Sequence, residues 1–107
     1  MSLRLLWAII RPEKAPQALQ RLAEEGFYAV TELRVYGRGK QRGIQVGSVT
    51  YDELAKTLLL LAVEQDRCAR AVQVIQEASR TGQPGDGKIF VQALGQVLTV
   101  RNGKPEL

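Results

Sequence analysis

The sequence predicts an α+β fold of the ferredoxin-like class, in which the elements follow the order β-α-β-β-α-β. Two amphipathic helical patterns alternate with short apolar or β-branched runs, and this alternation gives the order. A chain of 107 residues suits one domain, which we take to span residues 1–107. The third observation is a long connection between the second and third strands, which is out of proportion in so small a domain.

The first strand is predicted at residues 3–10, a short apolar run that Arg11-Pro12 closes. Side chains alternate along a strand, so both faces of this one are apolar. Leu5, Trp7 and Ile9 share one face, and Leu6, Ala8 and Ile10 share the other. We expect helices to cover one face and another subunit to cover the face of Trp7, since a large aromatic on a strand is more often packed than used to stack a ligand.

Two helices are predicted, because two segments have apolar residues at helical spacing. The first begins near Pro16 and ends at Gly26, a residue that tolerates the left-handed conformation. The second is predicted to have Asp66 as its N-cap and Gly82 as its stop. Cys68 lies on the apolar stripe of the second helix, where we expect it to serve packing.

The remaining strands are predicted from β-branched, aromatic and apolar runs. They are residues 28–36, 57–63 and 88–91, with a last strand at 96–101. Between the second and third strands, residues 37–55 contain four glycines and show neither the helical nor the strand periodicity of apolar residues. Loops of this length are usually functional or disordered.

The net charge of +4 admits a nucleic-acid-binding module as an alternative function. Four basic residues and no acid lie between positions 34 and 42, in the long loop and the strand before it. RNA-binding domains of this fold expose aromatic side chains on their central strands, and this sequence lacks the interleaving of aromatic and basic residues that they use. We therefore expect no nucleic-acid partner.

Other classes of function are disfavoured by composition. The chain has no histidine and one cysteine, so the commonest general base, a disulfide and a Cys/His metal cluster are all missing. It has no run of 18 apolar residues and no secretory signal pattern, so we expect a cytoplasmic protein without membrane insertion. An enzyme is not expected.

One glycine-rich segment suggests a phosphate site. After the second helix the chain reads TGQPGDGKIF at residues 81–90. Glycines let backbone amides turn toward an anion, and the following Lys88 adds an ammonium group. The alternative is a plain connection in which Gly85 and Gly87 supply positive φ angles and Lys88 is solvated.

The whole string resembles the B-loop of the PII family of nitrogen-signalling proteins. Residues 8–12 are similar to the family's first strand, and Thr31-Glu32 with Gly37-Arg38 are similar to the start of its long T-loop. Lys56 matches the lysine at the T-loop exit, and residues 101–103 resemble the start of the C-loop. The resemblance covers essentially the whole chain. Within the family, residues 37–47 and 51–54 resemble the NifI type, which is encoded beside nitrogenase genes.

The resemblance implies a trimer with ATP or ADP in the clefts between subunits, and a sensor of 2-oxoglutarate. It implies a T-loop at about 37–55, a B-loop at about 81–88 and a C-loop at about 101–107. The implied nucleotide-binding residues are Gly37, Arg38, Gly85, Asp86, Gly87, Lys88 and Arg101. Lys56 would pair with a carboxylate of 2-oxoglutarate, and Gln41 would contact 2-oxoglutarate and the Mg²⁺ ion held by ATP.

Two positions depart from the family pattern. Thr99 stands where a first arginine of the last strand is usual, which predicts weaker phosphate binding. Gly39 stands where the family has its Mg²⁺-binding glutamine, and Gln41 takes that role if Gly39-Lys40 is an insertion. Tyr51 is not aligned with the tyrosine that is uridylylated in enteric PII proteins, so we expect it to be a contact residue.

The resemblance also implies partners. Lys40, Arg42 and Tyr51 of the T-loop would contact the regulated protein, which for the NifI type is dinitrogenase. The active unit is a homotrimer or a mixed complex with a sister PII paralogue. An ammonium transporter or a transcription factor remains open as the alternative target.

Overall fold

The computed structural model describes residues 2–38, 44–46, 49–51 and 54–107, with only the backbone described for residues 44–46 and 49–51. Its elements in chain order are β1 (Leu3–Ile10), the short 3₁₀ helix η1 (Pro12–Lys14), α1 (Ala15–Glu24), β2 (Thr31–Gly37), β3 (Ile44–Val46), β4 (Val49–Tyr51), β5 (Leu54–Glu64), α2 (Gln65–Ser79) and β6 (Gly87–Leu94).

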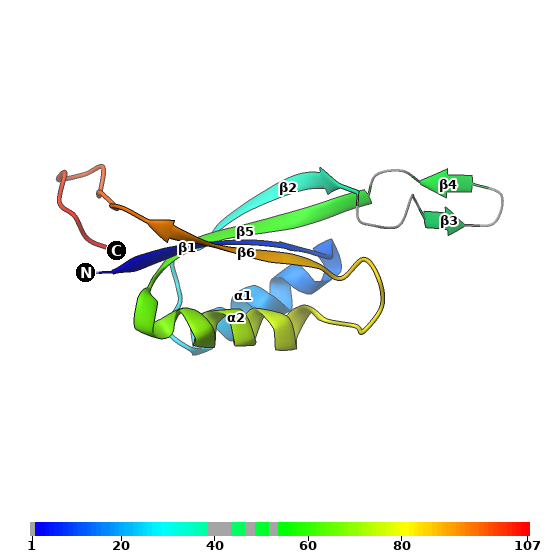
Figure 1. Cartoon of the computed structure of the whole chain (residues 1–107), viewed down its shortest axis with the longest axis horizontal. Helices are drawn as coiled ribbons and strands as arrows, with labels where there is room; N and C mark the ends of the chain where they lie inside the picture. Colours follow the sequence, from blue (N-terminus) through cyan, green and yellow to red (C-terminus); the bar gives the residue numbers. More distant parts are fainter. Residues whose placement is uncertain (1, 39–43, 47–48, 52–53) are drawn as a thin grey trace.

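Four strands form one antiparallel sheet in the order β2-β5-β1-β6, and both helices lie on one side of it (Figure 1). This is the ferredoxin-like arrangement that the sequence predicts. The short strands β3 and β4 form a separate two-stranded sheet beyond the ends of β2 and β5.

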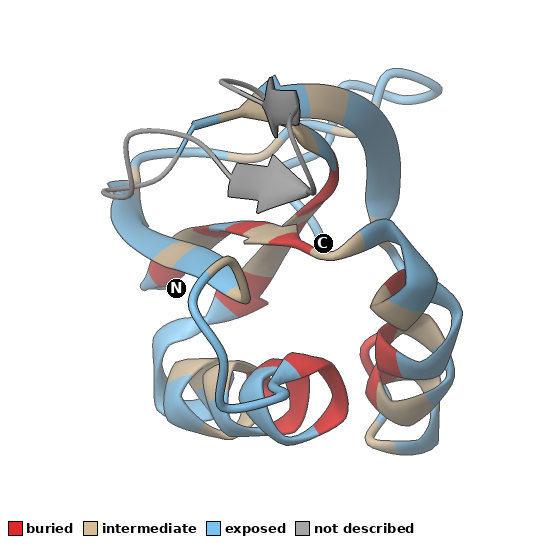
Figure 2. Ribbon diagram, turned by 90° about the vertical axis from the view of Figure 1, so that its right-hand side faces the viewer, coloured by how far each residue is buried: buried red, intermediate tan, exposed pale blue. Residues whose placement is uncertain are grey.

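The core lies between the sheet and the helices, where the buried positions gather (Figure 2). Alternation along β1 sends Leu6, Ala8 and Ile10 to this side, and all three are buried. The side chains that are most completely buried are Leu6, Leu22, Leu59, Val74 and Ile75. The predicted helix-facing side of β1 is therefore confirmed.

Neither helix covers the opposite face of the sheet in the part of the chain that the structure describes (Figure 1). Trp7 of β1 lies between Leu60 of β5 and Phe90 of β6 in the register of the sheet. Trp7 is 37% exposed and Phe90 53% exposed, and the indole Nε1 of Trp7 donates a hydrogen bond to Gln92 Oε1 at 3.0 Å. A broad apolar surface thus faces outward from this side.

The end of α1 is the one that the sequence predicts. The Gly26 N–H donates to Ala23 O at 3.0 Å, and the Phe27 N–H donates to Leu22 O at 2.8 Å. Gly26 has φ +90°, and Leu22 and Phe27 are both buried in the core. These bonds make a Schellman motif, in which a left-handed residue lets the last helical carbonyls find donors.

Both predicted caps of α2 are wrong. Asp66 lies inside the first turn, because the helix starts at Gln65 directly after the extended residue Glu64. The helix ends at Ser79, and Arg80 is already extended with φ −76° and ψ 142°. Gly82 has a positive φ of +86° but lies beyond this end.

Several strand boundaries differ from the predicted ones. β2 starts at Thr31 and not at residue 28. β5 is longer at both ends because its residues 54–56 pair with β2 and Glu64 pairs with Leu3 of β1, and β6 is longer because it pairs along the full length of β1. The predicted strand at 96–101 is wrong: residues 95–107 pair with no strand that the structure describes. The β3–β4 hairpin was not predicted, because three-residue strands show too little alternation to detect.

Candidate functional site

The B-loop lies at the end of the sheet where β1 ends and β6 begins. In Figure 1 it is the loop between α2 and β6, on the same side as the ends of β2 and the start of β5. The antiparallel order of the sheet brings these segments together, although they are far apart in the sequence.

Asp86 is the centre of this loop. Its Oδ2 accepts the N–H groups of Thr81 at 2.8 Å and of Gly82 at 2.9 Å, and its Oδ1 accepts the Thr81 hydroxyl at 2.6 Å. The Nε of Arg11 donates to the same Oδ1 at 3.0 Å. The hydrogen bond from the Thr81 hydroxyl, followed by those from Arg11 and the two amides, holds the pKa of the Asp86 carboxyl far below its ordinary value.

Arg11 joins the loop to the end of β1. Besides its bond to Asp86, it donates from Nη2 to the carbonyl oxygen of Pro84 at 3.0 Å. Pro84 and Gly85 are the central residues of a turn, and Gly85 has φ +97°, in the region that the second central residue of a type II turn occupies. The segment Gln83-Pro84-Gly85-Asp86 is therefore fixed by turn chemistry and by Arg11 together.

Gly87 is required by a close approach of backbone. A Cβ built at this position would lie 1.8 Å from the carbonyl oxygen of Ile9, and the residue has φ +114°. Gly87 is paired with Ile10 at the end of the β1–β6 ladder. A side chain at position 87 would push β6 away from β1.

Lys56 links the T-loop exit to the B-loop. It lies on β5, is 8% exposed, and its Nζ donates to the carbonyl oxygen of Gly85. Burial lowers the pKa of the Lys56 ammonium, and the neighbouring Arg11 guanidinium acts in the same direction. A Cβ at Gly37, at the end of β2, would lie 3.6 Å from Lys56 Cγ, so the start of the T-loop lies beside the same side chain.

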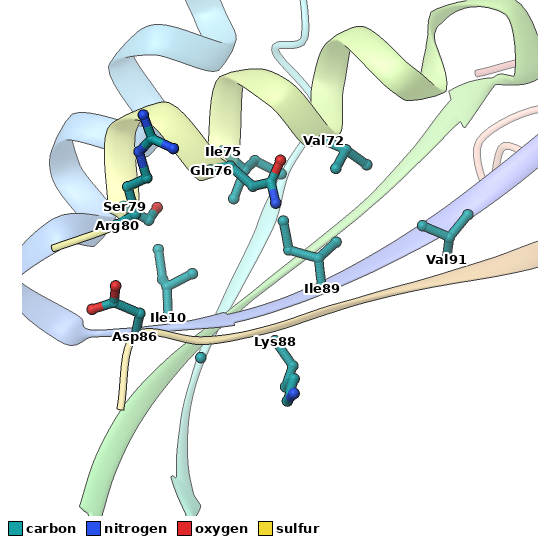
Figure 3. Close-up of a pocket in the computed structure, with 11 residues that line it drawn as sticks. Ile10, Val72, Ile75, Gln76, Ser79, Arg80, Asp86, Lys88, Ile89 and Val91 are labelled. Carbon is teal, nitrogen blue, oxygen red and sulfur yellow. The ribbon is translucent and has the colours of Figure 1, made fainter. Parts of the chain in front are cut away.

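The structure brings together most of the predicted site residues. One cluster around Lys56 and Arg11 contains the other predicted residues Gly37, Gly85, Asp86 and Gly87. Lys88 is exposed and points to the side of the sheet away from α2 (Figure 3). Arg38 is exposed just after β2.

Other predicted residues do not join this cluster. Arg101 is exposed and belongs to the C-terminal segment after β6, which lies at the opposite end of the sheet from the B-loop (Figure 1). Thr99 closes a turn there, with its N–H bonded to Lys104 O at 2.9 Å and its carbonyl bonded to Gly103 N at 2.7 Å. Lys40, Gln41 and Arg42 lie outside the described residues, and of Tyr51 only the backbone is described, paired with Ile44 in the β3–β4 hairpin.

Arg11 was not among the predicted site residues. Arg11-Pro12 was expected to close the first strand and to belong to the segment 8–12 that resembles the family's first strand, whereas the guanidinium contacts the B-loop 73 and 75 residues away. A charged residue directly after a buried strand is a weak signal for such a contact, because its partner becomes visible only when the sheet order is known.

A cavity of about 330 Å³ lies between α2 and β6, next to the B-loop (Figure 3). One part of its wall is formed by the aliphatic side chains of Ile10, Val72, Ile75, Ile89 and Val91, and another part by the polar residues Gln76 and Arg80. The hydroxyl of Ser79, which also lines it, is buried without a hydrogen-bond partner among the described residues. Asp86, Gly87 and Lys88 of the B-loop also line this cavity, so it adjoins the candidate phosphate site.

The sequence profile of the family described as Nitrogen regulatory protein P-II matches residues 3–104. A similar protein is the nitrogen fixation nifHD1 region GlnB-like protein 1 of Methanosarcina barkeri. It is 44% identical to this chain over 98% of this chain and 100% of its own length. The corresponding GlnB-like protein 1 of Methanococcus maripaludis strain S2 is 43% identical over 92% of this chain and 94% of its own. A nifHD region GlnB-like protein 2 of Methanococcus maripaludis is 38% identical over 91% of each chain.

The fold matches that of a PII protein. The crystal structure of Arabidopsis thaliana PII bound to citrate superposes with a TM-score of 0.81 at 31% identity, covering 97% of this chain and 85% of that one. Among the described residues, none of the helices is long and apolar enough to cross a membrane. A full-length family match, several relatives above 30% identity and the shared fold give one conclusion: this chain belongs to the PII family of nitrogen regulatory proteins, which are signalling proteins and not enzymes.

Proposed function

We propose that this chain is a cytoplasmic PII sensor that binds ATP or ADP with Mg²⁺ and responds to 2-oxoglutarate. Its output would be a T-loop contact with a protein of nitrogen metabolism, which we propose to be dinitrogenase. The names of the similar GlnB-like proteins, which refer to nitrogen fixation regions, support this choice of target. An ammonium transporter or a transcription factor is the second candidate target.

The observation that carries the proposal is the Lys56 contact. A largely buried ammonium group on β5 is bonded to the B-loop and lies beside the start of the T-loop at Gly37. A carboxylate that attracts Lys56 therefore acts on both loops at once. The citrate bound to the Arabidopsis thaliana relative is a tricarboxylate, which supports a carboxylate ligand for this fold.

The donor set around the loop fits a triphosphate. Lys88 and Arg38 are exposed cations near the B-loop and the T-loop start, and Gly85 and Gly87 allow close approach of backbone. In this proposal Asp86 supports the loop from inside, since its oxygens already accept four hydrogen bonds. Gln41, which lies outside the described residues, would supply the oxygen ligand to Mg²⁺ and contact 2-oxoglutarate.

Arg101 supports assembly into a trimer. It belongs to the predicted nucleotide-binding set, yet lies at the far end of the sheet within one chain. A neighbouring subunit would bring its own Arg101 to the B-loop, so a complete nucleotide site needs two copies. The uncovered apolar face around Trp7 and Phe90 would be buried by the same assembly. The copies would be identical, or would include a GlnB-like protein 2 of the kind found in Methanococcus maripaludis.

Calorimetric titration tests the sensor function. Mg-ATP is titrated first, and 2-oxoglutarate is then titrated with and without ATP. We expect 2-oxoglutarate to bind only when Mg-ATP is present, because the two ligands would share the metal. Lys56→Met should abolish the 2-oxoglutarate response and Gln41→Ala should weaken it, whereas Lys14→Met, which removes a lysine of η1, should leave it intact.

The other outcomes are informative. ATP binding with no 2-oxoglutarate response in the wild type would contradict the effector assignment and indicate an adenylate sensor, with Gly39 as the reason. No binding of ATP or ADP at all would contradict the nucleotide assignment. Pull-down from nitrogen-fixing cells with a T-loop variant, Lys40→Glu/Arg42→Glu, tests the target; capture of dinitrogenase that is unaffected by this double reversal would contradict the T-loop contact.

A further inference from the structure

We propose that Arg11 is the positioning residue of the nucleotide site. From the end of β1 it holds the B-loop in the shape that binds the nucleotide, without contacting the nucleotide itself. The inference rests on the proposed function, because it concerns the loop that would hold the phosphates. It concerns a residue outside the predicted binding set, at the end of β1.

The geometry of Arg11 suits this role. Nε and Nη2 lie on one edge of the guanidinium, and this edge donates to two acceptors on the loop, Asp86 Oδ1 and Pro84 O, each at 3.0 Å. A planar fork of this kind fixes the relative position of both acceptors. Arg11 is about one-quarter exposed on its side chain, at 23%, so both bonds are partly shielded from water.

The bond to Pro84 orients a peptide unit. The peptide between Pro84 and Gly85 is trans, so its carbonyl and its N–H point in opposite directions. Since the Pro84 carbonyl points to Arg11, the Gly85 N–H points away from it. Arg11 therefore sets the direction of a backbone donor that it does not touch.

The bond from Arg11 to Asp86 compensates the negative charge of the Asp86 carboxylate. A carboxylate beside a triphosphate repels it unless a cation compensates the charge. Asp86 is compensated by Arg11 and by donors from Thr81 and Gly82, all on the inner side of the loop. Without Arg11, the carboxylate loses its only salt bridge among the described residues and is no longer fixed from β1, so its bonds to the amides of residues 81 and 82 become weaker.

The loop is held from a second point by Lys56. Its ammonium group binds the carbonyl of Gly85, the residue after Pro84. When a carboxylate ligand withdraws Lys56, Arg11 becomes the remaining cation that holds this turn. Arg11 thus lets Lys56 serve the effector while the phosphate loop keeps its shape.

The test compares Arg11→Met and Arg11→Lys with Arg21→Met. Arg21 on α1 pairs with Glu24 and Glu77 on the helix surface, so its removal changes net charge equally without touching the loop. We expect Arg11→Met to weaken Mg-ATP binding by about tenfold or more, as loss of two charge-assisted bonds predicts. Arg11→Lys should recover part of this loss, because it restores the charge without the two-point fork, and Arg21→Met should bind as the wild type does.

Two readouts in the ligand-free protein separate positioning from general stability. In Arg11→Met the amides of Thr81 and Gly82 should exchange hydrogen faster, while amides of α1 and β5 stay as in Arg21→Met. The NMR titration of the Asp86 carboxyl should move upward in pH. Unchanged exchange at 81 and 82, or unchanged nucleotide affinity with a wild type that binds, would overturn the proposal.

The two failures are distinguishable. If the wild type binds neither ATP nor ADP, the proposed function fails and so does the nucleotide role of Arg11. The exchange and titration data from the ligand-free protein then decide by themselves whether Arg11 orders the loop.

Discussion

At the scale of single residues, the B-loop depends on Gly87, where a side chain would collide with the backbone of β1, and on Asp86, whose charge is paired with Arg11. Gly87 is the sharpest example, because its backbone lies against the Ile9 carbonyl at the end of the β1–β6 ladder. Its φ of +114° adds a conformational cost for any other residue. The glycine is therefore needed by the sheet itself, apart from any ligand.

We expect Gly87→Ala to lower the free energy of unfolding by about 3 kcal/mol or more, because the new Cβ would lie 1.8 Å from the Ile9 oxygen and the residue would be strained. Gly95→Ala is the matched control, since a Cβ there meets no described atom within 4 Å and φ is not in the left-handed region. Denaturant unfolding at equal protein concentration measures both. Equal stability of the two variants would contradict the close approach at Gly87.

At the scale of elements, contacts between ends of helices and strands decide where each element stops. The Schellman turn at Gly26 ends α1, and Arg67 of α2 covers this corner: its Cζ lies 4.2 Å from the centroid of the Phe27 ring and its Nη2 donates to Glu25 O at 2.7 Å. Arg70 also pairs with Glu25, and this hydrogen bond is the main cause that lowers the pKa of the Glu25 carboxyl. At the other end of α2, the Asp86 carboxylate takes the amides of Thr81 and Gly82 and turns the chain into the B-loop.

The B-loop should therefore be sensitive to acid. The folded pKa of Asp86 is below its ordinary value of 3.8, so the ionised carboxylate contributes stability that is fully present above about pH 4 and is lost as the pH falls below it. We expect thermal unfolding of the wild type to move to lower temperature between about pH 4 and pH 2. In Asp86→Asn this acid-dependent drop should be smaller, from a starting stability at pH 7 that is already lower.

Asp66→Asn is the control for this measurement, because Asp66 is an exposed carboxylate of α2 away from the loop. An acid-dependent drop of the same size in Asp86→Asn and in Asp66→Asn would contradict the assignment of this sensitivity to the B-loop.

At the scale of the whole molecule, the main feature is a sheet that, among the described residues, has helices on one side only (Figure 1). The helices bury Leu6 and its neighbours, whereas Trp7, Leu33 and Phe90 stay 37%, 46% and 53% exposed on the other face. Exposed apolar surface of this extent on a sheet indicates an interface. Trimeric assembly of this chain, as proposed, would cover this face and bring Arg101 of one copy to the B-loop of the next.

Phe90→Glu should shift the protein from trimer to monomer in light scattering after size exclusion, because it buries a charge in the proposed interface. Ala69→Glu places the same charge on an exposed position of α2 and should leave the assembly unchanged. If Phe90→Glu remains a trimer, the uncovered face is not the interface. If the wild type is a monomer, the assembly itself is contradicted.

Much of the site could be located from local sequence. The turn chemistry of Pro84-Gly85 and the glycines of the B-loop act over a few residues, so a short string was enough to identify them. The role of Asp86 could not be recognised in this way. It depends on where Arg11 lies, and the contact of Arg11 with Asp86 spans 75 residues of sequence.

Local periodicity and local backbone preference were enough to predict the order of the elements, the apolar alternation of β1 and the left-handed stop of α1 at Gly26. The lengths of β5 and β6, the absence of a strand at 96–101 among the described residues and the early end of α2 depend instead on contacts between distant segments. Strands extend as far as a partner offers backbone groups, and a helix ends where distant donors and acceptors compete for its last residues. The contacts of Arg11 and Lys56 with the B-loop also depend on the tertiary structure, because the sheet brings β1, β5 and β6 together.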